Sequence, residues 1–184
     1  MITLRRLGFA TALALAATAA PSIPVGALTA TAAPSIPVGA ATTQVSGLFV
    51  LDTDSTCTDS PPGFDELTFV ISGDLEGCWY TNVGRGWDLG PPSGLYFEVG
   101  REVFVGTVRG GPEGTFSTTY TFESRWDPSY TTHGKEIWGR CQHLIVRGSG
   151  TGGLHGVAGF IGRTDVVTDV INDGTVGRYR GFVG

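Results

Sequence analysis

The sequence predicts an all-β protein, a single antiparallel up-and-down barrel of about eight strands with little helix outside the N-terminal leader. Its 29 glycines and 10 prolines separate runs rich in Val, Thr, Phe and Tyr. No window keeps a 3.6-residue apolar period over three turns, whereas several runs alternate apolar and polar residues as strands do. Closure into a barrel removes sheet edges that no helix could cover. A two-sheet sandwich is the alternative, but it needs long crossing connections, and the turns here are local.

The first 40 residues predict a secretory leader. Arg5 and Arg6 precede an apolar run over residues 7–20, the pattern of a signal peptide. A membrane span is the alternative, but it needs about 20 apolar residues, and Pro21 and Pro24 end this run first. We therefore expect export, and no membrane span in the mature protein.

An internal repeat lies in the same region, because residues 18–27 recur as residues 31–40. The copies are too short and too rich in Pro and Ala to fold alone. Small residues place possible cleavage sites after Ala20, Ala27 or Ala40. We therefore expect residues 1–40 to be cleaved or disordered and residues 44–184 to form the barrel domain.

The strands expected from alternation are joined by turns rich in glycine, proline and aspartate. The clearest hairpin has its turn at residues 110–114, and its returning strand carries an aromatic face from Phe116 to Trp126. A loop is expected over residues 83–93, and a turn at residues 172–174. In chain order, the expected strands are 46–53, 64–82, 96–109, 115–127, 135–146, 164–171 and 176–183.

The segment 64–82 determines which cysteines can pair. Its apolar residues alternate throughout, which favours one long strand, although a hairpin at residues 73–74 is the competing interpretation. One long strand would hold Cys57 and Cys78 too far apart for a disulfide. Three cysteines in an exported chain predict one disulfide and one odd thiol. We therefore expect Cys141 to be bonded, preferably to Cys78 and otherwise to Cys57.

The stretch from Val146 to Gly156 contains a literal G-x-G-x-x-G match after an apolar run. A dinucleotide fingerprint needs a helix directly after its glycines. Here Gly156, Gly159 and Gly162 follow, and they would cost that helix about 3 kcal/mol relative to alanine. The stretch therefore predicts a turn between barrel strands, followed by a strand that bends at its glycines.

Four sets of residues together resemble secreted actinobacterial proteins of unassigned function with a calycin-like barrel. They are Gly77 to Thr81, Gly114 to Phe122, Gly139 to His143 and Val146 to Gly159. The alternation of strand, G-T-F hairpin and G-S-G-T-G-G more distantly resembles the allene oxide cyclase and dirigent barrels. This resemblance implies an eight-stranded antiparallel barrel with a central cavity. No catalytic residue of the cyclases matches a position in this chain.

The charge and the ligating residues exclude several functions. With 12 basic and 17 acidic residues, the chain has no basic footprint for nucleic acid or an anionic membrane. Its histidines, His133, His143 and His155, fit no metal-binding spacing, and no cysteine has a C-x-x-C partner. We therefore expect no metal and no cofactor.

Side chains that could carry acid–base chemistry are the carboxylates Glu98, Glu102 and Glu123. Alternation predicts that they pair with Arg101 and Arg125 on the barrel surface rather than face each other in a cleft. No nucleophile elbow is present, and His143 is expected to be a core or edge residue. No catalytic residue is assigned from the sequence.

Aromatic and polar side chains that could face the interior suggest a ligand site. An eight-stranded barrel either fills its interior or leaves room for one small molecule. The first hypothesis is a binding barrel for a small apolar or aromatic molecule, the second a cyclase or isomerase, and the third an envelope protein with a filled core. The candidate ligand-binding residues are Trp79, Tyr120, Phe122, Trp126, Trp138, Arg140, His143 and Tyr179.

Overall fold

The structure, a computed structural model, describes residues 42–127, 136–166 and 176–184. The leader at 1–40, His133 and the turn at 172–174 lie outside these residues. No helix occurs among the residues described, and none of them forms a helix that could cross a membrane. The strands are β1 (Thr43–Leu51), β2 (Leu67–Gly73), β3 (Leu75–Asp88), β4 (Leu95–Val108), β5 (Gly114–Trp126), β6 (Glu136–Ile145), β7 (Thr151–Gly152), β8 (Gly159–Val166) and β9 (Val176–Val183).

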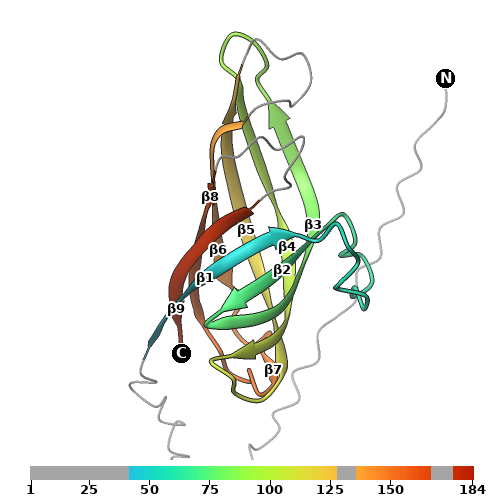
Figure 1. Ribbon diagram of the computed structural model, residues 1–184, viewed down its shortest axis with the longest axis vertical. Helices are drawn as coiled ribbons and strands as arrows, with labels where there is room; N and C mark the ends of the chain where they lie inside the picture. The colour runs from blue at the N-terminus through green and yellow to red at the C-terminus, as the bar shows by residue number, and fades with distance from the viewer. Residues whose placement is uncertain (1–41, 128–135, 167–175) are drawn as a thin grey trace, which may run out of the picture. The chain divides into compact units, whose positions relative to one another are not determined.

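The strands form a closed antiparallel barrel of eight strands, with β7 as a short addition beside β5 (Figure 1). Successive strands around the barrel follow one another along the chain, apart from the closing pair and from β6 and β8, which the short β7 separates in sequence. Strand β9 closes the barrel by pairing with β1, from Thr43 opposite Val183 to Val50 opposite Val176. The predicted all-β barrel is confirmed, and the sandwich alternative is wrong.

The segment expected as one strand over residues 64–82 is a hairpin of β2 and β3. Ile71 pairs with Gly77, so the chain turns around Asp74. Residues opposite each other in a hairpin share a face, and Ile71 and Gly77 are an even number of residues apart. The apolar alternation of β2 therefore continues in phase into β3, so the pattern fits a hairpin as well as one long strand. Strand β3 also continues to Asp88, through half of the expected loop at 83–93.

The disulfide joins Cys57 to Cys78, with 5.8 Å between the Cα atoms, and Cys141 is a free thiol. The expected pairing of Cys141 with Cys78, and its alternative with Cys57, are both wrong. The error follows from the missed hairpin, because the turn brings Cys78 back beside Val70 of β2.

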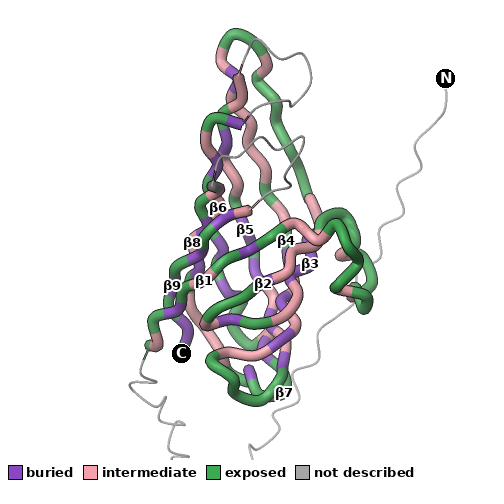
Figure 2. The backbone as a smooth tube through the Cα atoms, viewed as in Figure 1, coloured by how far each residue is buried: buried purple, intermediate pink, exposed green. Residues whose placement is uncertain are grey.

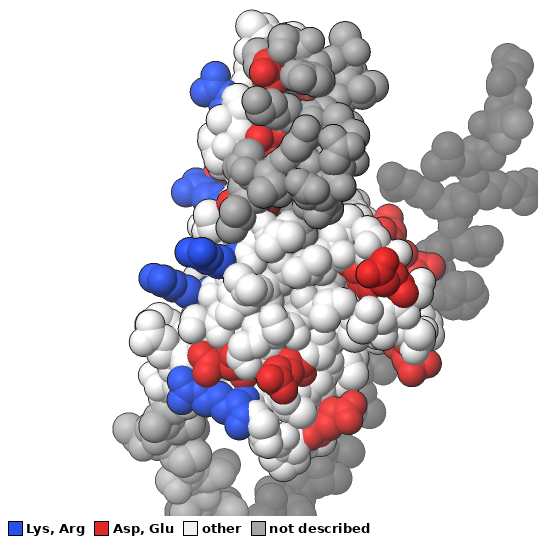
Figure 3. All heavy atoms as spheres, in the orientation of Figure 1, with Lys and Arg blue, Asp and Glu red and all other residues white. Residues whose placement is uncertain are grey.

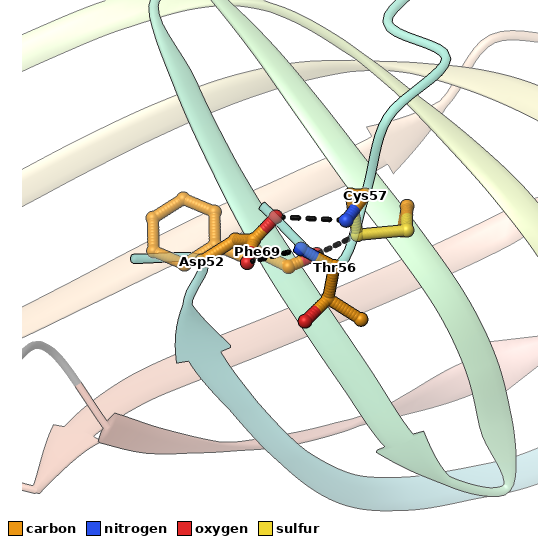
Figure 4. The surroundings of a disulfide bond; sticks show 5 residues. Asp52, Thr56, Cys57 and Phe69 are labelled. Atoms are coloured by element: carbon orange, nitrogen blue, oxygen red, sulfur yellow. Dashed lines mark hydrogen bonds between the residues drawn. A yellow bond between two sulfur atoms is a disulfide. The ribbon is translucent and has the colours of Figure 1, made fainter. Parts of the chain in front are cut away.

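The loop after β1 places Cys57 against β2 (Figure 4). The Asp52 carboxylate accepts hydrogen bonds from the backbone N–H of Thr56 at 3.0 Å and of Cys57 at 2.9 Å. These bonds lower the pKa of Asp52, and the bond from Cys57 has the larger effect. The sulfur of Cys57 lies 4.0 Å from the carbonyl oxygen of Phe69. The Asp52 carboxylate therefore holds the loop in a conformation that places Cys57 within bonding distance of Cys78.

Buried and more exposed residues alternate along the strands (Figure 2), and the buried apolar side chains form one core cluster that includes Leu75, just after the β2–β3 turn. Trp79 packs against Phe104 and Phe116, with ring centroids 5.5 and 5.6 Å away. The Tyr179 hydroxyl accepts a hydrogen bond from the Leu75 N–H at 2.7 Å. Gly47 allows this approach, because a Cβ there would collide with the Tyr179 ring. This half of the barrel is a filled core.

The glycine-rich stretch connects β6 to β8 without a helix, as predicted. Gly148, Gly152 and Gly156 have positive φ angles of 77°, 54° and 81°, which glycine adopts most readily. The Ser149 hydroxyl accepts a hydrogen bond from the Ser117 N–H at 2.9 Å, which fixes the turn to β5. Strand β8 begins at Gly159, earlier than the expected strand at 164–171, whose end lies outside the described residues.

Charged side chains are unevenly distributed on the barrel surface. In Figure 3, basic side chains gather along one edge of the face shown, and most acidic ones lie on its opposite side and near its lower end. Arg140 and Glu123 form an ion pair at 2.6 Å on the outer surface. An exposed pair of this kind contributes at most about 1 kcal/mol to stability.

Candidate functional site

A cavity of about 200 Å³ lies inside the barrel, at the end where β1 stops and β2 begins. Strand β3 runs past β2 at this end, so the barrel wall is higher there (Figure 1). The volume is below the range of about 300–1,000 Å³ that holds drug-sized ligands. The lining residues are Phe49, Leu51, Leu67, Phe69, Thr81, Glu98, Glu102, Tyr120, Phe122, Trp126, Glu136, Cys141, Arg163 and Asp165.

Three ionisable side chains meet at the inner end of the cavity. The Nδ1 atom of His143 lies 2.5 Å from Oε2 of Glu102, and an Nη atom of Arg163 lies 3.9 Å from Oε1 of Glu102. All three are at most 4% exposed. Glu102 also accepts hydrogen bonds from the hydroxyls of Thr81 at 3.2 Å and Thr118 at 2.9 Å. The Glu102 carboxylate is therefore fully partnered inside the barrel.

The electrostatics of this group fix its charge state. Burial opposes ionisation of Glu102, but His143 and Arg163 outweigh it and hold the pKa of Glu102 at about 2. Burial lowers the pKa of His143. At neutral pH the imidazole is therefore neutral and donates its Nδ1–H to an ionised Glu102, while Arg163 supplies the positive charge.

Arg163 has hydrogen-bonding capacity that this group does not use. Its guanidinium carbon lies 5.1, 5.2 and 4.2 Å from the ring centroids of Phe49, Phe69 and Trp79, which are cation–π contacts. Its Nε and Nη2 atoms are buried and have no hydrogen-bond partner. A buried donor left unpaired costs about 1–3 kcal/mol, and more when it is charged. Arg163 therefore keeps unused hydrogen-bonding capacity beside the cavity.

A pair of carboxyls, Glu136 and Asp165, lines another part of the cavity. A Cβ at Gly139 would collide with a carboxyl oxygen of each, so both side chains converge on that glycine. Glu136 is 3% exposed, and its Oε1 atom has no partner. Burial, together with the charge and hydrogen bond of Asp165, raises the pKa of Glu136 to about 8, and burial raises that of Asp165. The two carboxyls therefore share a proton at neutral pH.

Glu98 lies on the same face of β4 as Glu102 and is held by two tyrosines. The Tyr96 hydroxyl donates to its Oε2 at 2.6 Å, and the Tyr120 hydroxyl donates to its Oε1. Burial and the Glu98 carboxylate raise the pKa of both tyrosines, so both hydroxyls stay protonated donors. Tyr120 thus lines the cavity with its hydroxyl already occupied.

Five of the eight candidate ligand-binding residues lie at the cavity or beside its inner end. Tyr120, Phe122 and Trp126 line it. Trp79 and His143 contact each other, with ring centroids 5.3 Å apart. Trp79 also contacts Arg163, and His143 contacts Glu102, and both of these partners line the cavity. The structure thus places these five side chains in the barrel interior, and their binding of a ligand stays a prediction.

The other three candidates lie elsewhere, so their prediction as cavity residues is wrong. A β-bulge opposite Arg125 and Trp126 pairs Trp138 with the outward-facing Arg125, and Arg140 pairs with Glu123 outside the barrel. Tyr179 belongs to the filled half, because its hydroxyl is bound to Leu75.

The expected surface position of Glu98 and Glu102 is also wrong. Glu98 pairs with Phe122 and Glu102 with Thr118 across β4 and β5, and both partners belong to the inward-facing set. Residues directly opposite each other share a face. Assigning the register of the β4–β5 hairpin would therefore have placed both carboxylates inside the barrel. Glu123 does lie outside, but its partner is Arg140 rather than Arg101 or Arg125.

Arg163, Asp165 and Glu136 were not recognised from the sequence. Arg163 lies between Gly162 and Thr164, before the strand that was expected there, so its inward position had no pattern to indicate it. Glu136 begins β6 beside the bulge, and bulges leave little trace in composition. Among the described residues, no three His, Cys, Asp or Glu side chains converge as metal ligands.

The fold and the cavity define a class: a closed, eight-stranded antiparallel barrel that is filled at one end and holds a small, acidic, aromatic-walled cavity at the other. No protein family and no curated protein matches this chain. The function therefore has to be argued from the geometry of the cavity.

The carboxyl pair leads to a prediction about stability and pH. An unfolded glutamate ionises near pH 4.3. With its folded pKa at about 8, Glu136 stabilises the fold fully below pH 4, and this contribution is lost as the pH rises to 8. We expect the contribution of Glu136 to the free energy of unfolding to fall by about 1–2 kcal/mol between pH 6.5 and 8. Urea denaturation at several pH values measures it. Glu136→Gln should remove most of this slope, and an unchanged slope in that variant would contradict the assignment.

Proposed function

We propose that this protein is a secreted barrel that binds one small molecule in the cavity, a molecule with an apolar or aromatic body and an oxygen acceptor. The observation that carries the proposal is Arg163, whose Nε and Nη2 donors are buried at the cavity without a partner. Buried donors in folded proteins are almost always paired. An oxygen of the ligand would complete them, while Phe122 and Trp126 would contact its apolar part.

The cavity volume supports a small ligand. About 200 Å³ corresponds to roughly six or seven water molecules at 30 Å³ each. A filled barrel with a purely structural role has less support, because its interior would not leave charged donors and acceptors unpaired. Secretion is part of the proposal and rests on the leader pattern together with the Cys57–Cys78 disulfide, which suits an oxidising compartment.

The test is to incubate the purified protein with an extract of its native medium and to identify retained compounds by mass spectrometry. Leu67→Trp is the decisive variant, because Leu67 lines the cavity and is 39% exposed, so a larger side chain there narrows the opening without entering the filled core. We expect it to reduce retention at least tenfold. The matched control is Leu144→Trp, on the outer face at 60% exposed, which should retain as much as the unmodified protein. If neither protein retains a compound, the binding function is wrong.

A second candidate is a cyclase or isomerase that acts on the bound molecule, as the resemblance to allene oxide cyclases implies. The observation that favours it is the Glu136–Asp165 pair, which at neutral pH holds a proton that it could donate to a substrate at the cavity. The same extract tests it: a compound would be converted rather than retained, and Glu136→Gln would abolish the conversion. Retention without conversion favours the binding role.

A further inference from the structure

Two features of the cavity are complementary to opposite ends of one ligand. Arg163 presents unpaired donors, and Glu136 presents an unpaired oxygen beside Asp165. Arg163 and Asp165 are two residues apart on β8, so their side chains leave the same face of the strand about 7 Å apart. A ligand that spans this distance would meet the hydrogen-bond donors of Arg163 at one end and the carboxyl oxygens of Glu136 and Asp165 at the other.

The charges in the cavity favour a cation at the carboxyl end. Arg163 is already balanced by Glu102, at 3.9 Å. Glu98 is bound by two tyrosine hydroxyls, and among the residues that the structure describes the basic side chain acting on the carboxyl pair is Arg163, through Asp165. An anionic ligand would therefore be repelled at this end, whereas an ammonium group would let both carboxyls ionise. The other titratable and charged side chains that line the cavity with the pair are Glu98 and Glu102 of β4, Tyr120 of β5, Cys141 of β6 and Arg163 of β8, and His143 of β6 is hydrogen-bonded to Glu102.

The cavity walls suit an amine with an aromatic body. Phe122 and Trp126 line the cavity together with Glu136 and Asp165. Aromatic faces beside carboxylates attract organic cations. A metal ion has less support, because no third ligand converges with this pair among the described residues.

We propose that the cavity takes a small protonated amine, whose ammonium group binds Glu136 and Asp165 and displaces the proton they share, while an oxygen at its other end accepts from Arg163. The inference rests on the proposed function and adds the ligand class. No bond in the ligand changes. The displaced proton passes from the carboxyl pair to solvent, so binding at neutral pH should release about one proton per ligand.

The probe is tyramine, which carries an ammonium group, an aromatic ring and a phenolic oxygen. Isothermal titration calorimetry in two buffers of different ionisation enthalpy measures both the affinity and the protons released. At pH 7 we expect release of about one proton, and at pH 9 none, because the pair is then already ionised. Between pH 6 and 7.5 the dissociation constant should fall roughly tenfold per pH unit.

Three analogues separate the contacts. Phenethylamine lacks the oxygen, tyrosol replaces the amine with a hydroxyl, and 3-(4-hydroxyphenyl)propionate replaces it with a carboxylate. We expect tyrosol and phenethylamine to bind at least tenfold more weakly than tyramine and the propionate not to bind. Tyrosol that binds as tightly as tyramine would overturn the amine inference and leave the binding function standing.

The variant Glu136→Gln, which keeps the shape of a protonated glutamate, should abolish proton release and reduce tyramine affinity to that of tyrosol. Its matched control is Glu123→Gln, which removes a carboxylate on the outside of the neighbouring strand and should change neither quantity. Proton release that persists in Glu136→Gln overturns the inference. So does failure of tyramine to bind while the extract experiment retains a compound; if that experiment also retains nothing, the proposed function fails as well.

Discussion

Replacing Glu102 with glutamine is expected to lower the free energy of unfolding by about 3–5 kcal/mol. Glutamine keeps the shape but removes the charge that balances Arg163, and Arg163 is 4% exposed and has no second carboxylate within 4.0 Å among the described residues. An uncompensated buried charge is among the most destabilising single changes. Denaturation in guanidinium at pH 7, followed by tryptophan fluorescence, measures the effect.

The control for this variant is Glu123→Gln, which breaks the exposed ion pair with Arg140 and should cost at most about 1 kcal/mol. A double variant, Glu102→Leu with Arg163→Met, removes both charges and should recover most of the loss. If Glu102→Gln and Glu123→Gln cost the same, Glu102 does not hold a buried charge and the description of the cavity is wrong.

Removal of the Cys57–Cys78 disulfide is expected to cost about 3 kcal/mol, because the unfolded chain regains the freedom of the loop that the bond closes. The two cysteines are 21 residues apart. The double variant Cys57→Ala, Cys78→Ala should melt well below the unmodified protein and should no longer respond to a reductant. Differential scanning calorimetry with and without dithiothreitol measures both effects.

The third cysteine provides the matched control. Cys141→Ala should keep the full response to dithiothreitol, because Cys141 is a free thiol. Peptide mapping without reduction should find Cys57 linked to Cys78. A bridge that includes Cys141, or loss of the reductant response in Cys141→Ala, would refute the pairing.

The architecture followed from the sequence because strand alternation and turn residues act locally. The β4–β5 hairpin shows this: its turn begins at Gly110, and the inward set from Phe116 to Ser124 is buried or half-buried as expected. Register is a different property, since it depends on which residues face each other across strands. Ile71 pairs with Gly77 in phase with the alternation, so the pattern could not distinguish a hairpin from a long strand.

The site was harder to predict than the fold for the same reason. Trp79 and Phe122 could be placed inside from alternation alone. The carboxylates were assigned to the surface because charge usually indicates exposure, yet a buried carboxylate needs only a buried cation, and Arg163 lies 61 positions further along the chain. Partners so distant in sequence meet only once the barrel has closed, so composition and spacing carry no sign of them.

The pairing of β1 with β9 determines when this barrel can form during synthesis. Thr43, in the first strand of the barrel, lies opposite Val183, in its last strand. All the other barrel strands must therefore be synthesised before the first strand finds its second neighbour. Until then β1 has an open edge that another chain could pair with. This delay would suit the export that is part of the proposed function, because a chain that has not closed its barrel can still cross a membrane in an extended form.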